Sequence, residues 1–312
     1  MSGTDFEGAA NPSETNGSTH RAFKRFSRGA LTGDVTGSTD GITSDSTFLH
    51  VPEGQTELAN ARRIVSQYGT IIRYCPSWRA WLIWDGTRWR FDDSGEIVRL
   101  AKACASGLWN EPRKAGTTPK AVELARFAHR SCSRKGIDNA VALATTEKRV
   151  VIQPDELDAD PWLLNCPNGT LDLRSGHICP HEAAAYITKL CPTPYDATAS
   201  SEVWDYFLNT TLPDSEVREF VQRFFGYCLT GDVREQVLPL FVGEGANGKT
   251  TLLMAILETL GGDYAIKGDK KLVVVQNRQT HPTELMDMHG KRFVFVTETE
   301  RGERLAEALE HF

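Results

Sequence analysis

Eight consecutive residues in the C-terminal half of the chain have the types and the spacing that hold a phosphate chain. They are Gly243, Glu244, Gly245, Ala246, Asn247, Gly248, Lys249 and Thr250, in the pattern GxxxxGK[ST]. Glycines let the backbone wrap a phosphate, and the free amides at the start of a helix point at it. Lys249 is expected to reach the terminal phosphates, and the Thr250 hydroxyl is expected to hold Mg²⁺.

This loop requires a strand before it and a helix after it. An apolar run at 240–242 precedes the loop and predicts the strand. A helical pattern follows at 251–260 and is closed by two glycines, Gly261 and Gly262. The segments on both sides therefore support a phosphate-binding loop, and Thr251 joins the expected nucleotide contacts.

A second apolar run, at 292–296, leads to two acidic residues, Glu298 and Glu300. Its β-branched and aromatic residues fit a parallel strand that is covered on both faces. Glu298 follows the carboxyl end of this strand, where ligands of open α/β sheets gather, and alternation places Glu300 on the same side. One carboxylate is expected to hold the water shell of Mg²⁺ while the other orients the attacking water. The predicted catalytic residues are Lys249, Glu298 and Glu300, and the predicted metal ligands are Thr250 and Glu298.

The overall composition is that of an ordinary globular protein without a global basic character. The chain has 312 residues, which is enough for about two domains. Its formal net charge is -6, so any contact with DNA or RNA must come from a local patch or from an assembled ring. No apolar run approaches the length of a membrane span, and the N-terminus has no signal-peptide core. We therefore predict a cytoplasmic protein without membrane contact.

The seven cysteines are odd in number and include no CxxC pair. Reduced thiols are therefore predicted rather than structural zinc or a disulfide framework. His177, Cys179 and His181 lie close in sequence, but their spacing matches no established zinc pattern, so we predict no metal site there.

Residues 1–52 are dominated by Gly, Ser, Thr and Asp, and they are predicted to form a disordered tail because they cannot bury enough apolar surface. A basic-aromatic island at 21–28 lies within this tail, either unbound or in contact with nucleic acid. Order is predicted from Thr56, where a helix begins that Gly69 caps.

A hairpin is predicted around Asp85 and Gly86, which lie between apolar runs. Two roles stay open for the tryptophans around it, stacking on bases or packing against the helices that follow. These residues are Trp78, Trp81, Trp84 and Trp89.

Helical patterns follow at about 95–109, 120–132 and 137–145. This region contains more basic than acidic residues. Two interpretations stay open, a solvated helix face and a surface that faces DNA. Its basic residues include Arg113, Lys114, Lys120, Arg126, Arg130, Arg134 and Lys135.

Short strands joined by tight turns are predicted at 168–177, and a domain boundary is predicted near 198–200. Beyond it, one helix is predicted to begin at Trp204, and Asp214 is the predicted N-cap of a longer helix that stops at Gly231. The predicted parts are a tail at 1–52, an α+β domain at 53–200, and a helical bracket with the first part of an ATPase core at 201–312.

Several runs resemble parts of a known family, from roughly Ala59 to the last residue. Two of them look like the domain that precedes the helicase in phage and plasmid primase–helicases and in the poxvirus primase–helicase, namely residues 161–165 and 168–176. Three others resemble the start of that family's superfamily 3 helicase core, namely residues 226–231, 245–251 and 290–292 followed by Glu298, Thr299 and Glu300.

The resemblance implies a role for each matching residue. Gly243, Gly248, Lys249 and Thr250 become the Walker A contacts, with Asn247 as the variant typical of superfamily 3. Glu298 takes the Walker B position, and Glu300 is a second acid. Thr299 separates the two acids, so their division into metal ligand and base stays open. The fold implied is α/β, an incomplete AAA+-like parallel-sheet core after a mainly helical α+β domain and a disordered tail.

The function implied is that of an ATP-dependent replicative DNA helicase subunit. ATP with Mg²⁺ is the expected cofactor, and hydrolysis would drive translocation on single-stranded DNA in a homo-hexameric ring, with a primase or other replication proteins as partners. No primase catalytic motif is present, and the sequence ends at Phe312 before the family's DNA-gripping hairpin, sensor strand and arginine finger. A fragment or a truncated product with impaired hydrolysis is therefore expected. The alternatives are a nucleotide-gated DNA-binding or assembly module without hydrolysis, and a P-loop kinase.

Overall fold

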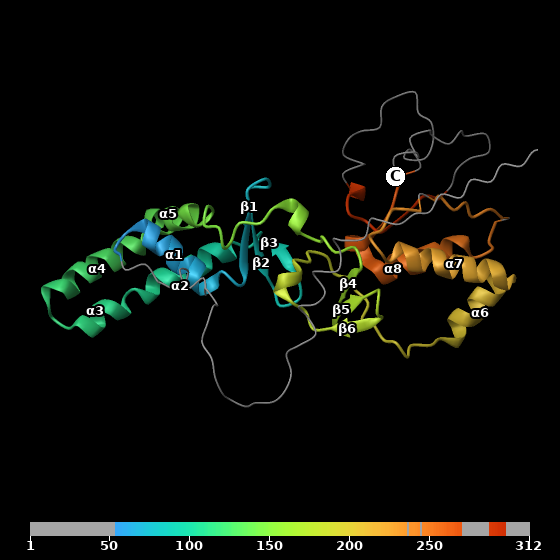
Figure 1. Ribbon diagram of the computed structural model, residues 1–312, viewed down its shortest axis with the longest axis horizontal. Helices are drawn as coiled ribbons and strands as arrows, with labels where there is room; N and C mark the ends of the chain where they lie inside the picture. Colours follow the sequence, from blue (N-terminus) through green and yellow to red (C-terminus); the bar gives the residue numbers. More distant parts are fainter. Residues whose placement is uncertain (1–53, 236, 244, 270–286, 298–312) are drawn as a thin grey trace, which may run out of the picture. The chain divides into compact units, whose positions relative to one another are not determined.

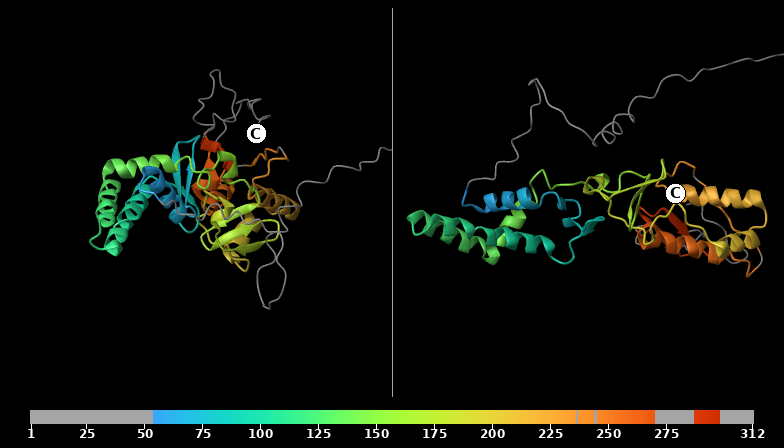
Figure 2. Two further views of the ribbon diagram at one scale, coloured as in Figure 1. Left: turned by 60° about the vertical axis from the view of Figure 1, so that its left-hand side comes forward. Right: turned by 90° about the horizontal axis from the view of Figure 1, so that it is seen from below.

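The computed structural model describes residues 54–235, 237–243, 245–269 and 287–297. This part of the chain is a mixed α/β structure with three small sheets (Figures 1 and 2). None of the described helices combines the length and the apolar character that a membrane span needs. The predictions for the tail at 1–52, including the basic-aromatic island at 21–28, fall outside the described residues.

Helix α1 (Glu57–Tyr68) begins and ends where the sequence predicts. The Thr56 hydroxyl accepts a hydrogen bond from the Ala59 amide at 3.1 Å, which satisfies one of the free donors of the first turn. At the other end the Gly69 amide donates to the Val65 carbonyl at 2.8 Å. Local capping chemistry therefore sets both ends of this helix.

The first sheet is antiparallel and consists of β1 (Ile72–Cys75), β2 (Ala80–Trp84) and β3 (Trp89–Phe91). The predicted hairpin at Asp85 is confirmed, since this carboxylate accepts hydrogen bonds from the Thr87 and Arg88 amides at 2.8 and 2.9 Å. Trp89 is only 1% exposed, and its ring nitrogen donates to the Ala183 carbonyl at 2.8 Å. For this tryptophan, packing is the role that the structure supports.

Four helices follow: α2 (Glu96–Gly107), α3 (Asn110–Ala115), α4 (Pro119–Ser131) and α5 (Arg134–Ala144). Three of them match the predicted helical patterns. The sequence pattern missed α3, because six residues are too few to show a helical period and Pro112 interrupts them. Proline is tolerated there since it lies in the first turn, where its missing amide has no helical acceptor.

The second sheet is also antiparallel, with β4 (Leu163–Cys166), β5 (Gly169–Asp172) and β6 (His177–Cys179). The last two strands confirm the predicted short strands at 168–177. Two short 3₁₀ turns lie before and after this sheet, at Pro154–Glu156 and Ala183–Ala185.

The C-terminal elements are α6 (Glu202–Thr211), α7 (Ser215–Cys228), α8 (Lys249–Tyr264), β7 (Ala265–Lys267) and β8 (Phe293–Phe295). Asp214 caps α7 as predicted, accepting a hydrogen bond from the Glu216 amide at 2.8 Å. One hydrophobic core joins these elements to the second sheet, with Leu164 and Leu171 in the same cluster as Phe225 and Leu252. The core thus includes residues on both sides of 198–200, and the predicted domain limits stay predictions.

The strands of the predicted nucleotide core match the expectation only in part. β8 pairs with β7 in parallel, as predicted for the run at 292–296, but Val294 is 38% exposed while Phe293 and Phe295 are buried. The described residues therefore cover the strand on one face, and the expected cover on both faces stays a prediction. The run at 240–242 forms no strand in the described part of the chain, and Val242 is 90% exposed. A strand needs ladder partners for its backbone, and the described residues offer none to this run. A larger parallel sheet is accordingly not formed by the described residues.

Candidate functional site

The glycine-rich loop at 243–248 leads directly into α8, whose first residue is Lys249. Gly248 is the N-cap and has the left-handed backbone φ 84 and ψ -4, which a glycine adopts without strain. Gly245, Ala246 and Asn247 are exposed, so a phosphate group has access to the loop. All of the predicted loop residues are described except Glu244, which lies outside the described residues together with Glu298 and Glu300.

The Lys249 side chain folds back over the loop that precedes it. Its ammonium donates to the Gly243 carbonyl at 3.0 Å and to the Asn247 side-chain oxygen at 2.6 Å. Both acceptors are neutral, and an anionic oxygen would form stronger, charge-assisted bonds with the same ammonium. Thr250 and Thr251 follow in the first turn of α8 and are exposed. The oxygen of the Thr250 hydroxyl is a ligand of the type that Mg²⁺ prefers.

Helix α6 lies against the loop, and no sequence motif predicts this contact. A Cβ atom added to Gly248 would lie 2.6 Å from the Thr211 hydroxyl oxygen and 3.0 Å from a ring carbon of Phe207. Glycine is therefore required at this position by the close approach of α6 as well as by the positive φ. Thr211 and Phe207 are the residues near the loop that reasoning from sequence missed.

We expect Gly248→Ala to weaken ATP binding at least tenfold, because the added methyl group meets α6 and the left-handed backbone of a non-glycine residue is strained. Titration of a fluorescent ATP analogue would measure the change. Gly245→Ala is the matched control, since an added Cβ there meets nothing within 4 Å and needs no positive φ. Equal losses for the two variants would contradict the role assigned to α6.

The other end of α8 breaks at Gly261, where the sequence predicts the helix to close. Gly261 has φ 69 and ψ 173, and an added Cβ would lie 2.5 Å from the Pro192 ring. Regular hydrogen bonding resumes for one short turn to Tyr264. The break presents Asp263 and Tyr264 to the segments that precede the helix.

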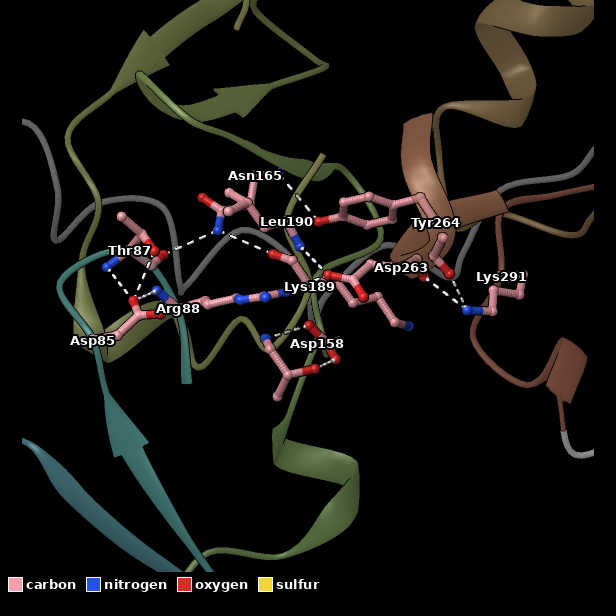
Figure 3. A network of polar contacts seen from close by, with 12 residues as sticks. Asp85, Thr87, Arg88, Asp158, Asn165, Lys189, Leu190, Asp263, Tyr264 and Lys291 are labelled. Atoms are coloured by element: carbon pink, nitrogen blue, oxygen red, sulfur yellow. Dashed lines mark hydrogen bonds and ion pairs between the residues drawn. The ribbon is translucent and has the colours of Figure 1, made fainter. Parts of the chain in front are cut away.

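Asp263 is the centre of a polar network that connects α8 with the β2–β3 turn (Figure 3). Its carboxylate forms an ion pair with Arg88 and accepts a hydrogen bond from the Leu190 amide at 3.0 Å. The Arg88 Nε atom is buried and has no hydrogen-bond partner among the described residues. Lys291, which lies in the last described segment, donates to the Asp263 carbonyl at 3.5 Å. Residues far apart in sequence therefore hold the end of the helix that begins at Lys249.

Asn165 of β4 is fully buried, and its amide group bonds four partners (Figure 3 shows part of the set). Its nitrogen donates to the Thr87 and Lys189 carbonyls at 3.0 Å each. Its oxygen accepts from the Thr170 hydroxyl at 3.1 Å and lies 2.9 Å from Nδ1 of His181. The side chain thus ties the β2–β3 turn and the segment at 189 to the second sheet.

Tyr264 completes this region from the α8 side. The backbone N–H of Asn165 donates to the Tyr264 hydroxyl oxygen at 3.2 Å, and burial raises the pKa of the phenol. Arg292 lies over the Tyr264 ring at 4.8 Å and donates to the Leu229 and Leu163 carbonyls at 2.6 and 2.7 Å. Burial lowers the pKa of Arg292. These contacts fix where β8 begins.

The loop and β8 share one packing neighbour, Phe225 of α7. Its ring lies 6.4 Å from the Phe241 ring, just before the loop, and 5.6 Å from the Phe293 ring in β8. Both segments therefore belong to the same core. The described residues reach Thr297 on this strand, so the approach of Glu298 and Glu300 to Lys249 stays a prediction.

The candidate metal residues of the second sheet lie apart from this site. His177 and Cys179 are exposed on β6, whereas His181 bonds Asn165. In the described ranges no group of three or more His, Cys, Asp or Glu side chains is arranged to hold a metal ion. The seven cysteines, all within these ranges, carry free thiols.

Comparison with known proteins finds one matching family and several viral relatives. The family described as "D5 N terminal like" matches residues 61–213. A protein of Acanthamoeba polyphaga mimivirus, provisionally named a helicase, is 30% identical over 142 residues, which are 44% of this chain and 15% of that protein. A protein of African swine fever virus, provisionally named a primase, is 25% identical over 161 residues, 48% of this chain and 16% of its own length. One of Invertebrate iridescent virus 6, provisionally named a helicase, is 28% identical over 124 residues, 38% of this chain and 13% of its own length. The chain therefore spans only a small part of these relatives.

Proposed function

We propose, from the match of residues 61–213 to the D5 N terminal like family, that the chain is part of an ATP-dependent replicative DNA helicase subunit of the primase–helicase type. In this proposal the loop at 243–248 binds the phosphates of ATP, and hydrolysis drives translocation on single-stranded DNA. The active assembly is a homo-hexameric ring that works in the cytoplasm with a primase or other replication proteins.

One observation carries the nucleotide part of the proposal. The exposed loop, the left-handed Gly248 and the Lys249 ammonium lie together at the start of α8. Free amides and the positive end of the helix dipole favour an anion at this position. This arrangement supports a triphosphate ligand, because Lys249 already holds two acceptor oxygens that phosphate oxygens would replace.

The roles of the residues follow from their chemistry. Lys249 neutralises charge on the terminal phosphates, and the Thr250 hydroxyl holds Mg²⁺, which supplies electrostatic stabilisation of the transferring phosphate. Glu298 and Glu300 are proposed to serve as the second contact to the metal shell and as the base that orients the attacking water. Which of these two acids contacts the metal shell and which serves as the base stays open.

Binding of ATP with Mg²⁺ by the 312-residue chain tests the proposal. We expect saturable binding in a calorimetric titration, with a dissociation constant between about 1 μM and 1 mM, the range in which enzymes bind their substrates. The absence of any binding in this range would refute the nucleotide site, and transfer of phosphate to a small acceptor instead of water would identify a kinase.

A further inference from the structure

In one segment of this acidic chain the basic residues outnumber the acidic residues. Residues 101–150 contain ten Lys and Arg against four Asp and Glu, whereas the remaining sequence contains 25 against 37. The segment includes α3, α4 and α5, which follow one another in Figure 1. A local charge of +6 inside a chain of -6 is the kind of patch that a polyanion attracts.

The basic side chains of these helices are exposed, and few of them are paired. We define the basic surface by seven exposed residues: Arg113, Lys114, Lys120, Arg126, Arg130, Arg134 and Lys135. Within the described ranges only Arg134 of this set has a carboxylate within 4 Å, that of Asp138 at 3.5 Å, and both members of the pair are solvent-exposed. An exposed pair of this kind contributes little, so the charges of the basic surface are essentially unneutralised.

Three of the seven charges lie near helix N-termini, whereas Arg113, Lys114 and Arg130 lie in last turns, where the helix dipole favours them. Arg134 and Lys135 lie in the first turn of α5, and Lys120 lies in the first turn of α4. Neither helix has an acidic residue in its first turn. Positive charge at a helix N-terminus is opposed by the helix dipole, and an anion bound nearby would relieve this repulsion.

We propose that the basic surface of α3, α4 and α5 binds the phosphate backbone of duplex DNA. Sites for single strands combine basic residues with exposed aromatic rings on which bases stack. The exposed large apolar residues on these helices are Val122 and Leu143, both aliphatic, while Phe127 is buried. The surface therefore offers phosphate contacts without stacking, which suits a duplex whose bases are already paired. This site lies outside the proposed nucleotide loop and extends the proposed function by a contact to DNA that is not yet unwound.

The length of the surface fits several phosphates. Helix α4 has 13 residues and is therefore about 20 Å long at 1.5 Å per residue. Phosphates recur about every 3.4 Å along each strand of the duplex axis. Arg126 and Arg130 lie one turn apart on the same side of this helix and can contact separate phosphates of one strand.

Fluorescence anisotropy with a labelled random duplex of about 20 base pairs tests the proposal, without nucleotide so that the result does not depend on ATP binding. The variant combines Arg126→Ala, Arg130→Ala and Lys135→Ala, which are exposed helix positions where alanine preserves the helix. We expect at least tenfold weaker binding. The slope of log affinity against log salt should also fall by roughly 2 to 3, since about one counterion is released for each phosphate contact.

The control variant combines Arg62→Ala, Arg99→Ala and Arg223→Ala, which remove the same charge from exposed side chains that each already pair with a glutamate. We expect it to bind duplex within about twofold of the unchanged chain. Equal losses of duplex affinity in both variants would show that binding depends only on net charge, and this would overturn the proposal. Tighter binding of a single strand of the same length, or equal competition by polyglutamate, would overturn the choice of duplex DNA.

Discussion

Replacing Lys249 with alanine is expected to weaken binding of ATP with Mg²⁺ about 100-fold. The ammonium is proposed to form charge-assisted hydrogen bonds with the terminal phosphates, each of which contributes about 1.5–3 kcal/mol. At the lower value, two such bonds contribute about 3 kcal/mol, which is a factor of about 100, since every 1.4 kcal/mol corresponds to a factor of ten. The folded state should be unaffected, because the hydrogen bonds of Lys249 to the Gly243 carbonyl and the Asn247 side chain lie within the exposed loop. Calorimetric titration would measure the affinity, and a thermal melt would check the fold.

Lys267→Ala is the matched control for this experiment. Lys267 is an exposed lysine on β7, and its loss removes the same charge without touching the loop. We expect its ATP affinity to stay within about twofold of the unchanged chain. If Lys249→Ala binds ATP as well as Lys267→Ala does, the loop is not the nucleotide site, and the proposed ATP-dependent activity loses its structural basis.

Replacing Asn165 with alanine is expected to lower the free energy of unfolding by about 3–5 kcal/mol. The side chain is completely buried, and its removal leaves the Thr87 and Lys189 carbonyls without their donor. The Thr170 hydroxyl also loses its acceptor. A buried polar group left without a partner costs about 1–3 kcal/mol, and the three groups here are buried or partly buried and belong to three separate segments of the chain. Urea unfolding followed by circular dichroism would measure the change.

Two further variants show whether the destabilisation comes from these hydrogen bonds. Asn165→Asp keeps the shape of the side chain but removes both donors, so most of the destabilisation should persist. Asn139→Ala removes a less buried asparagine whose amide donates to the Glu57 carboxylate at 2.8 Å, and it should cost less than about 1 kcal/mol. A small effect of Asn165→Asp would show that reduced packing, and not the network, explains the alanine result.

Lys249 and Asn165 act at the two ends of one helix. The loop at 243–248 and Lys249 lie at the start of α8, where α6 packs against Gly248. Asp263 and Tyr264 lie at its end, where they contact Arg88 and Asn165. The helix that carries the predicted phosphate contacts is thus held at its far end by residues from the segment that matches the D5 N terminal like family.

Elements with a local cause could be predicted from the sequence. The Thr56 and Asp214 caps, the Asp85 hairpin and the glycine break at Gly261 all depend on contacts within a few residues, and the structure contains each of them. The resemblance to primase–helicases is confirmed by the family match and the viral relatives. Two short elements, α3 and β7, show no period and were not predicted.

The sequence by itself determined the chemistry that the chain offers: a phosphate-binding pattern, a helix to follow it, and a basic segment inside an acidic protein. Only the tertiary structure decided that the run at 240–242 forms no strand with the described residues, that α6 closes on Gly248, and that Asn165 joins segments as distant as Thr87, 78 residues away. The physical reason is the range of the interactions. Caps and turns are satisfied by near neighbours in the chain, whereas ladder pairing, close approach and buried hydrogen bonds depend on partners that folding brings together from far along it.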